Sequence, residues 1–415
     1  MATFSLKRFT HQETMKSIRQ DHLLSLFDPH TSYFARRGVD LAPSLPVLRA
    51  AEPMAAYGGA VPIRQEAEAI DIDYEGIARV LMTPDETTPR ELVDDLFFVD
   101  EMATPESMDA LRDEIAKLPL AQRKKLELGP DPTPADVAVM VRLHAPDILE
   151  KMHAESLLVS KRSFQYFQPA NGNGKAFTAP TDKQLRTLEA VFDDAFDQMK
   201  RGRNSKVYVF ERADEVWLLV RHDDPCKREG ALITSGPSSV YYRPEVFDVV
   251  RYDRKTGELS VNAGNCKKIY DLYREKIGLH LFDDALHFPA GKAKFTLDPL
   301  RTDGEESLVC TDIDGMESVV LKEVQYFWGG PEKEVEIRKA SNLFEAWKRK
   351  NRKIPERARI SKAKFEVKFT DSKTPRMVAV TNSNVTSFTR DGDATAVDTW
   401  MAKRGFAMVP GEANA

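Results

Sequence analysis

Two charged side chains near the C-terminus have the types and spacing that metal-dependent phosphodiester chemistry requires. In Phe365-Glu-Val-Lys-Phe369 the charged residues alternate with apolar ones. Successive side chains of a strand point to opposite faces, so we expect Glu366 and Lys368 on one face. A carboxylate can hold Mg²⁺ against a phosphate, and a nearby lysine can orient the attacking water. The segment therefore indicates one half of a hydrolytic site.

Such a site needs a further acid upstream. Asp314 lies 52 residues before Glu366, and a second arrangement pairs Asp314 with Glu323, with Gln325 where the lysine is expected. Both arrangements resemble the D...ExK pattern of the PD-(D/E)XK nucleases, over a few residues each. The resemblance implies a Mg²⁺-dependent nuclease whose catalytic residues come from Asp314, Glu323, Glu366 and Lys368.

A basic segment offers a different chemistry. Residues 338–368 hold 12 Lys and Arg against 3 Asp and Glu, although the chain as a whole has 60 basic and 65 acidic residues. A row of cations can follow a phosphate backbone without reading its sequence. The alternative is a solvated helix end followed by a linker, where the cations favour the helix dipole. The candidate phosphate contacts are Lys348, Arg349, Lys350, Arg352, Lys353, Arg357, Arg359, Lys362 and Lys364.

The elements that must position these residues divide the chain into four parts. Residues 1–75 are predicted to be an irregular arm, with a polar helix near 11–27 and a proline-rich loop at 42–60. Residues 76–168 have apolar residues at helical spacing and three Thr-Pro starts, at Thr88, Thr104 and Thr133, in which threonine can cap the first turn. They are expected to form a helical domain. A Gly- and Asn-rich stretch then predicts a flexible linker at 169–180.

Residues 181–415 begin with an amphipathic helix and continue as strands. Two hairpins are expected, 206–211 with 216–221 and 247–253 with 258–261, and further strands at 293–297, 307–311, 318–327, 364–369 and 376–381. Helices are expected at 266–277, 340–352 and 398–403. Hairpins dominate, so the predicted class is α+β, with a helical domain followed by a mainly antiparallel sheet.

Composition excludes several other classes of protein. Hydrophobic residues make up 42% and charged residues 30% of the 415 residues, as in ordinary globular proteins. No window approaches the roughly 18 apolar residues of a membrane span, and no secretory leader is recognisable. Three separated cysteines and the histidine spacings predict no disulfide framework and no metal site. We therefore expect a cytoplasmic protein without a cofactor, except Mg²⁺ under the nuclease hypothesis.

One stretch carries a resemblance beyond short motifs. Tyr242-Arg-Pro-Glu-Val-Phe-Asp-Val-Val-Arg-Tyr-Asp253 and Tyr273-Arg-Glu-Lys-Ile-Gly-Leu-His-Leu-Phe282 are similar to uncharacterised bacterial proteins of phage-defence loci. The resemblance covers residues 205–345 and implies work beside an effector such as a nuclease or helicase. The leading hypothesis is a non-enzymatic accessory protein of a multi-protein complex that binds a partner protein and nucleic acid, DNA or RNA. The alternatives are the metal-dependent nuclease and an assembly subunit without nucleic-acid contact.

Overall fold

The protein is described by a computed structural model. It describes residues 6, 9, 11–41, 72–126, 128–129, 131–170, 177–212, 214–233, 236–264, 266–372, 374–389 and 394–408. The proline-rich loop predicted at 42–60 and the centre of the predicted linker, 171–176, lie outside these residues.

The chain forms two compact units. The first comprises residues 1–154 together with 230–239, and the second comprises 155–229 and 240–415. Residues 155–168 therefore belong to the second unit, although their sequence pattern predicts the helical domain. Each unit is considered by itself below.

The described part of the first unit is helical, apart from the hairpin tip at 230–239. Thr104 and Thr133 cap their helices as predicted, and each hydroxyl oxygen accepts a 3.1 Å hydrogen bond from a backbone N–H three residues on. Thr88 does not cap its helix, because the N-cap position of the helix that follows is Pro89, which has no side chain that could accept a hydrogen bond. The elements are α1 (Gln12–Lys16), α2 (Gln20–Phe27), η2 (Asp28–His30), α3 (Thr31–Arg36), α5 (Tyr74–Met82), α6 (Arg90–Met102), α7 (Pro105–Lys117), α8 (Leu120–Arg123), η4 (Lys124–Leu126), α9 (Pro134–His144) and the part of α10 (Pro146–Ser160) that precedes residue 155.

The core of this unit surrounds α9. Every residue of α9 from 135 to 141 is buried, and α2, α6 and α7 all contact it. The N-terminal helices belong to the same core, because Leu24, Phe27 and Phe34 are fully buried in it. The predicted irregular arm is thus partly an integral piece of the helical unit, because α1 to α3 also have an apolar face.

The second unit is built on a ten-stranded antiparallel sheet, so the predicted α+β class is confirmed. Its strand order is β2-β3-β6-β7-β1-β12-β11-β10-β8-β9, with β1 joining two halves. Its strands are β1 (Ser163–Phe167), β2 (Lys206–Glu211), β3 (Glu215–Asp223), β6 (Glu245–Asp253), β7 (Leu259–Asn262), β8 (Met316–Gly329), β9 (Glu334–Lys339), β10 (Arg359–Phe369), β11 (Arg376–Thr381) and β12 (Val385–Ser387). A separate hairpin joins β4 (Lys227–Ile233) and β5 (Gly236–Tyr242).

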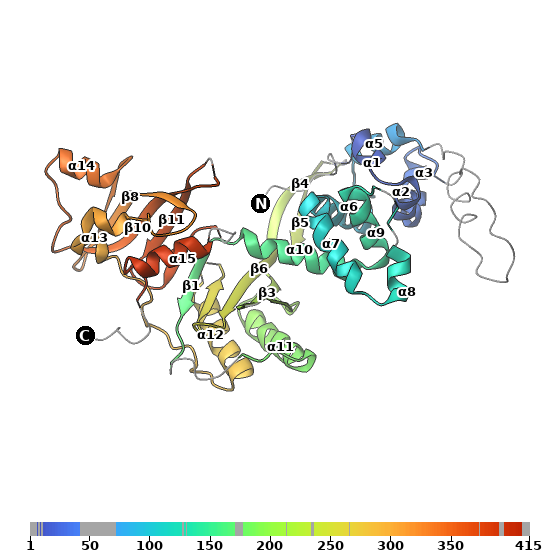
Figure 1. Cartoon of the computed structure of the whole chain (residues 1–415). Helices are drawn as coiled ribbons and strands as arrows, with labels where there is room; N and C mark the ends of the chain where they lie inside the picture. The colour runs from blue at the N-terminus through green and yellow to red at the C-terminus, as the bar shows by residue number, and fades with distance from the viewer. Residues whose placement is uncertain are drawn as a thin grey trace. The chain divides into compact units, whose positions relative to one another are not determined.

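Helices cover each half of the sheet (Figure 1). In the first half, α11 (Asp182–Gln198) and α12 (Lys267–Phe282) share a core with strands β2, β3, β6 and β7. In the second half, α15 (Ala394–Lys403) packs on one face, where the rings of Phe365 and Trp400 lie 5.2 Å apart. The short elements α13 (Pro299–Thr302), η5 (Gly304–Leu308) and α14 (Leu343–Arg349) complete the unit.

Both predicted hairpins form, but other details differ from the prediction. The expected strand at 293–297 is reduced to one bridge, Phe295 with Ala407, and the one at 307–311 is replaced by η5 and a turn. Helix α12 continues past Gly278, where the expected end was placed. A Cβ atom at Gly278 would lie 2.6 Å from the carbonyl oxygen of Asp284, so glycine is needed there for close packing rather than for a helix end.

Candidate nucleic-acid interface

Strand β10 separates a buried face from an open face of the sheet. Ala363, Phe365 and Val367 are buried on the side of α15. The side chains between them, Lys364 and Glu366 among them, are only partly buried and point to the other face. We call this other face of β8 to β12 the open face. The alternation that the sequence shows thus places a row of charged residues on it.

The register of the strands aligns the charges of neighbouring strands. Lys364 pairs with Glu323 of β8 on one side and with Ala379 of β11 on the other. Glu323 pairs in turn with Lys339 of β9, and Ala379 with Ser387 of β12. A single row across five strands therefore runs from charged side chains to small ones.

An irregularity in β8 adds a further cation to this face. The pairing with β10 shifts by one residue between Lys364 and Phe365, so Lys322 is an extra residue opposite β10. A β-bulge of this kind changes the direction of a side chain. As a result the consecutive residues Lys322 and Glu323 both line the open face, instead of pointing to opposite sides.

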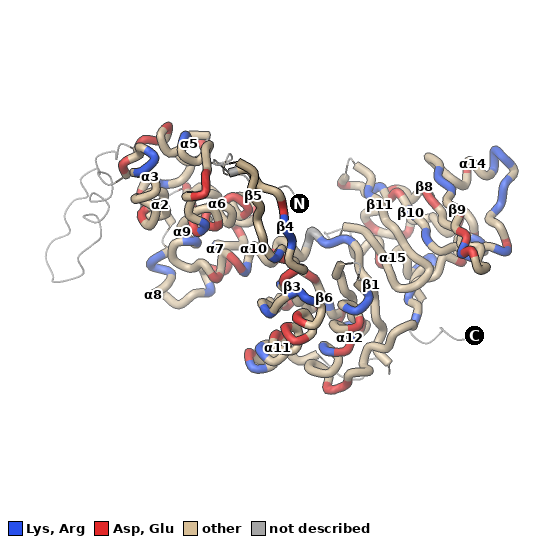
Figure 2. The backbone as a smooth tube through the Cα atoms, turned by 180° about the vertical axis from the view of Figure 1, so that it is seen from behind, with Lys and Arg blue, Asp and Glu red and all other residues tan. Residues whose placement is uncertain are grey.

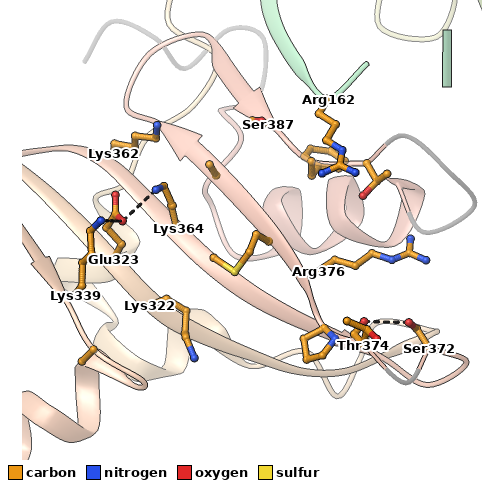
Figure 3. Close-up of a pocket in the computed structure, with 16 residues that line it drawn as sticks. Arg162, Lys322, Glu323, Lys339, Lys362, Lys364, Ser372, Thr374, Arg376 and Ser387 are labelled. Carbon is orange, nitrogen blue, oxygen red and sulfur yellow. Dashed lines mark hydrogen bonds and ion pairs between the residues drawn. The ribbon is translucent and has the colours of Figure 1, made fainter. Parts of the chain in front are cut away.

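These residues enclose a groove of about 990 Å³ (Figure 3). Six of its lining residues are cations, and Glu323 is the one carboxylate among the described lining residues. Uncharged and small side chains, including Met377, Ala379 and Ser387, form the rest of the surface between them. We name six of the lining residues the groove cations: Arg162, Lys322, Lys339, Lys362, Lys364 and Arg376.

Glu323 holds two of the groove cations. Its Oε2 lies 3.1 Å from the Nζ atoms of both Lys364 and Lys339, and its side chain is 10% exposed. Burial by itself would raise the pKa of this carboxyl, but hydrogen bonds from the two lysines outweigh it and lower the pKa. Glu323 is therefore a fixed negative charge that partly neutralises the groove.

Two groove cations, Lys362 and Arg162, form no ion pair with any carboxylate in the part of the chain that the structure describes. Lys322 differs from them, because it is bound to Glu366 with 3.2 Å between Nζ and Oε1. Figure 3 shows Lys362 and Arg162 on either side of Ser387. Their charges are available to an anion that enters the groove.

The remaining cations of the basic segment lie elsewhere. Lys348, Arg349, Lys350, Arg352 and Lys353, which we call the α14 cations, extend from α14 into the following turn, and Figure 2 shows this basic stretch in blue. All five are exposed. Lys348 pairs with Glu305 and Arg349 with Glu345, over 2.9 Å in the second pair. The charges of Lys348 and Arg349 are therefore partly compensated by these carboxylates.

The last two candidates, Arg357 and Arg359, follow the α14 cations. Arg357 is exposed, in a segment whose carbonyl groups accept hydrogen bonds from Arg301. The Arg359 guanidinium lies 5.5 Å from the centre of the Phe327 ring. The structure thus brings only Lys362 and Lys364 of the predicted phosphate contacts into the groove.

The candidate nuclease residues are spread along β8 and β10. Glu366 and Lys368 share the open face, but the Lys368 ammonium lies 3.4 Å from Glu317 and donates to the Phe369 carbonyl. Asp314 lies in the turn before β8, and Met316, the first residue of β8, pairs with Phe369, three residues along β10 from Glu366. Three residues of a strand span roughly 10 Å. Among the described residues there is no group of three or more His, Cys, Asp or Glu that could hold a metal ion.

Three groove cations, Arg162, Lys322 and Arg376, lie outside the predicted segment, and Lys339 lies inside it but was not a predicted contact. Arg162 comes just before β1, in a stretch whose pattern predicts the helical domain. Lys322 and Glu323 line the open face together only because of the bulge, since strand alternation alone would put two consecutive residues on opposite sides. No local pattern identifies Arg162 or the bulge.

A second polar cluster, in the first half of the sheet, has the residue types of an acid–base site. His222 Nε2 lies 3.0 Å from Oδ2 of Asp248, and the Tyr273 hydroxyl donates to the same oxygen over 2.8 Å. All three residues are at most 2% exposed, between the sheet and α12. This cluster is closed to ligands, and its role is to stabilise the core.

No protein-family model matches the chain, and no curated protein matches its sequence.

Among the described residues, no helix has both the length and the apolar character needed to cross a membrane.

Proposed function

We propose that the protein is a non-enzymatic accessory component of a multi-protein system and binds nucleic acid through the groove cations. The observation that carries the proposal is the groove itself, in which six cations from β1's N-terminal flank and four strands face one carboxylate. Phosphate oxygens are the ligands that such a lining favours, and binding would release counterions. Side chains that reach phosphates without reading bases give binding that is independent of sequence.

We further propose that the chain works in a phage-defence system, on the resemblance that its sequence suggests for residues 205–345. It would place the chain beside an effector protein that acts on nucleic acid. The chain would then hold the nucleic acid or the complex, and the effector would carry out the chemistry.

The experiment is a titration of the purified full-length protein into labelled single- and double-stranded DNA and RNA, at low and at physiological salt. We expect binding at low salt whose affinity falls as salt rises. Polyglutamate is the control for a general polyanion site. Absence of binding to every nucleic acid at low salt, or equal competition by polyglutamate, would refute the proposal and favour an acidic protein segment as the ligand.

The same titration with Mg²⁺ tests the nuclease alternative. Cleavage that the Glu366→Ala variant abolishes would show that Glu366 is catalytic, since a contaminating nuclease would remain in both preparations. We expect no difference between the two proteins, because Glu366 is bound to Lys322 and Asp314 lies in the turn before β8, beyond the strand residue that pairs with Glu366.

A further inference from the structure

The shape of the groove restricts which nucleic acid it can hold. The residues of one row across its floor, Ala379 and Ser387, are small, and Lys364 lies beside them in the same row. Lys362 and Lys364 of β10 stand on one side of this floor, and Arg162 stands on the other (Figure 3). From β10 to β1 there are three strand spacings, about 14 Å between backbones. The long cationic side chains narrow this width further.

The floor itself is uncharged and partly apolar. Met377 is 47% exposed there, beside Ala379 and Pro375. A phosphate gains nothing from such a surface, whereas the flat face of a base is apolar and loses water favourably on it. In a duplex the base faces are already stacked inside the helix, so they cannot reach the floor.

The groove cations for which the described residues supply no carboxylate stand on the two sides rather than on the floor. These are Lys362 and Arg162, and the hydroxyl group of Ser387 lies between them as a further donor. Phosphates are therefore favoured at the sides of the groove and bases at its centre.

From this arrangement we infer that the groove binds one extended single strand of nucleic acid, with bases on Met377 and Ala379 and phosphates on Lys362 and Arg162. The inference rests on the proposed function and names the form of its ligand. A duplex would contact the cations of one side only and leave the floor uncovered.

The test compares Met377→Ala with a matched variant, Ile337→Ala. Ile337 is a similarly exposed apolar residue, 51% exposed, on β9 of the same open face, but it does not line the groove. Fluorescence anisotropy would measure the affinity of the full-length protein for a labelled 12-nucleotide oligothymidine or oligouridine, and for a duplex of 12 base pairs, at one salt concentration.

We expect the unmodified protein to bind the single strands at least about tenfold more tightly than the duplex. We expect Met377→Ala to weaken single-strand binding about fivefold, since a base loses its apolar contact, and to leave duplex binding within about twofold. Ile337→Ala should change neither affinity.

Several outcomes would overturn the inference while leaving nucleic-acid binding intact. These are equal or tighter binding of the duplex, or equal effects of the two apolar substitutions on the single strand. Only the loss of all nucleic-acid binding at low salt would refute the proposed function as well. Unchanged duplex affinity of Met377→Ala also shows that the variant is folded.

Discussion

The Lys364 ammonium lies 3.1 Å from Oε2 of Glu323, and the same oxygen lies 3.1 Å from the ammonium of Lys339. One carboxylate thus links three adjacent strands, β9, β8 and β10, in the row that crosses the groove. Glu323 is the one carboxylate among the described residues that line the groove. It therefore opposes the approach of an anion and neutralises part of the charge of both lysines.

Replacement of Glu323 by Gln is therefore expected to strengthen nucleic-acid binding. The substitution removes one negative charge and leaves the charges of Lys364 and Lys339 uncompensated, so we expect roughly a threefold to tenfold higher affinity at low salt. Glu336→Gln is the matched control, because Glu336 pairs with Arg338 on β9 away from the groove lining. Weaker binding by Glu323→Gln would show instead that the carboxylate is needed to position the lysines.

Charge reversal separates the two sets of cations. Lys362→Glu with Lys364→Glu should weaken binding by about tenfold or more for each lysine that no longer binds a phosphate, since a charge-assisted hydrogen bond contributes about 1.5 kcal/mol. The variant should also bind with a weaker salt dependence: the negative slope of log affinity against log salt should become shallower by about one to two. The measurement is anisotropy at several salt concentrations, with circular dichroism to confirm that the sheet is retained.

The matched variant reverses four of the α14 cations, Arg349, Lys350, Arg352 and Lys353, to Glu. We expect a smaller effect than that of the groove variant, because these residues lie outside the groove. A larger effect would place the main phosphate contacts on α14, as the basic segment of the sequence predicts.

The partly buried pair of Arg251 and Glu215 predicts a loss of stability in acid. Glu215 accepts hydrogen bonds from Arg251 and, over 2.7 Å, from the indole N–H of Trp217. Burial raises the pKa of this carboxyl, but the Arg251 contact outweighs it, so the folded pKa lies below the ordinary 4.5. Its contribution is therefore present above pH 4.5 and is lost as pH falls through the lower folded pKa.

Denaturant unfolding between about pH 3 and pH 7, followed by tryptophan fluorescence, measures this contribution. We expect Glu215→Gln to lower the free energy of unfolding by about 2 kcal/mol near neutral pH, since a mostly buried Arg251 loses its principal partner. The variant should lose less stability than the unmodified protein as the pH falls. Parallel pH curves for the two proteins would refute the assignment.

The closed cluster around Asp248 predicts a second effect on stability. Asp248→Ala removes the hydrogen-bond partner that His222 Nε2 and the Tyr273 hydroxyl share, and it leaves their polar groups buried without that partner. We expect a loss of about 3 kcal/mol or more in the free energy of unfolding. Tyr273→Phe removes only one donor and should have a smaller effect. Nucleic-acid affinity should change in neither variant at temperatures where both are folded, because the cluster does not line the groove.

Local sequence patterns were sufficient for several elements. Alternation in β10 predicts that Glu366 and Lys368 share a face, and the structure places them so. The threonines before α7 and α9 cap their helices as predicted, because the capping interaction joins residues three apart in the chain. The hairpins β2–β3 and β6–β7 also follow from short turns between apolar strands.

The groove depended on pairings that no local pattern contains. Arg162 reaches it because β1 pairs with β12, more than 200 residues later in the chain. Lys322 and Glu323 line it together through a one-residue shift in the pairing of β8 with β10, and Glu323 acquires its two lysines from different strands. The sequence by itself determined helices, hairpins and which side chains of one strand share a face, because these depend on near neighbours. Only the tertiary structure decided which strands became adjacent and in what register, because that choice depends on the packing of the whole sheet.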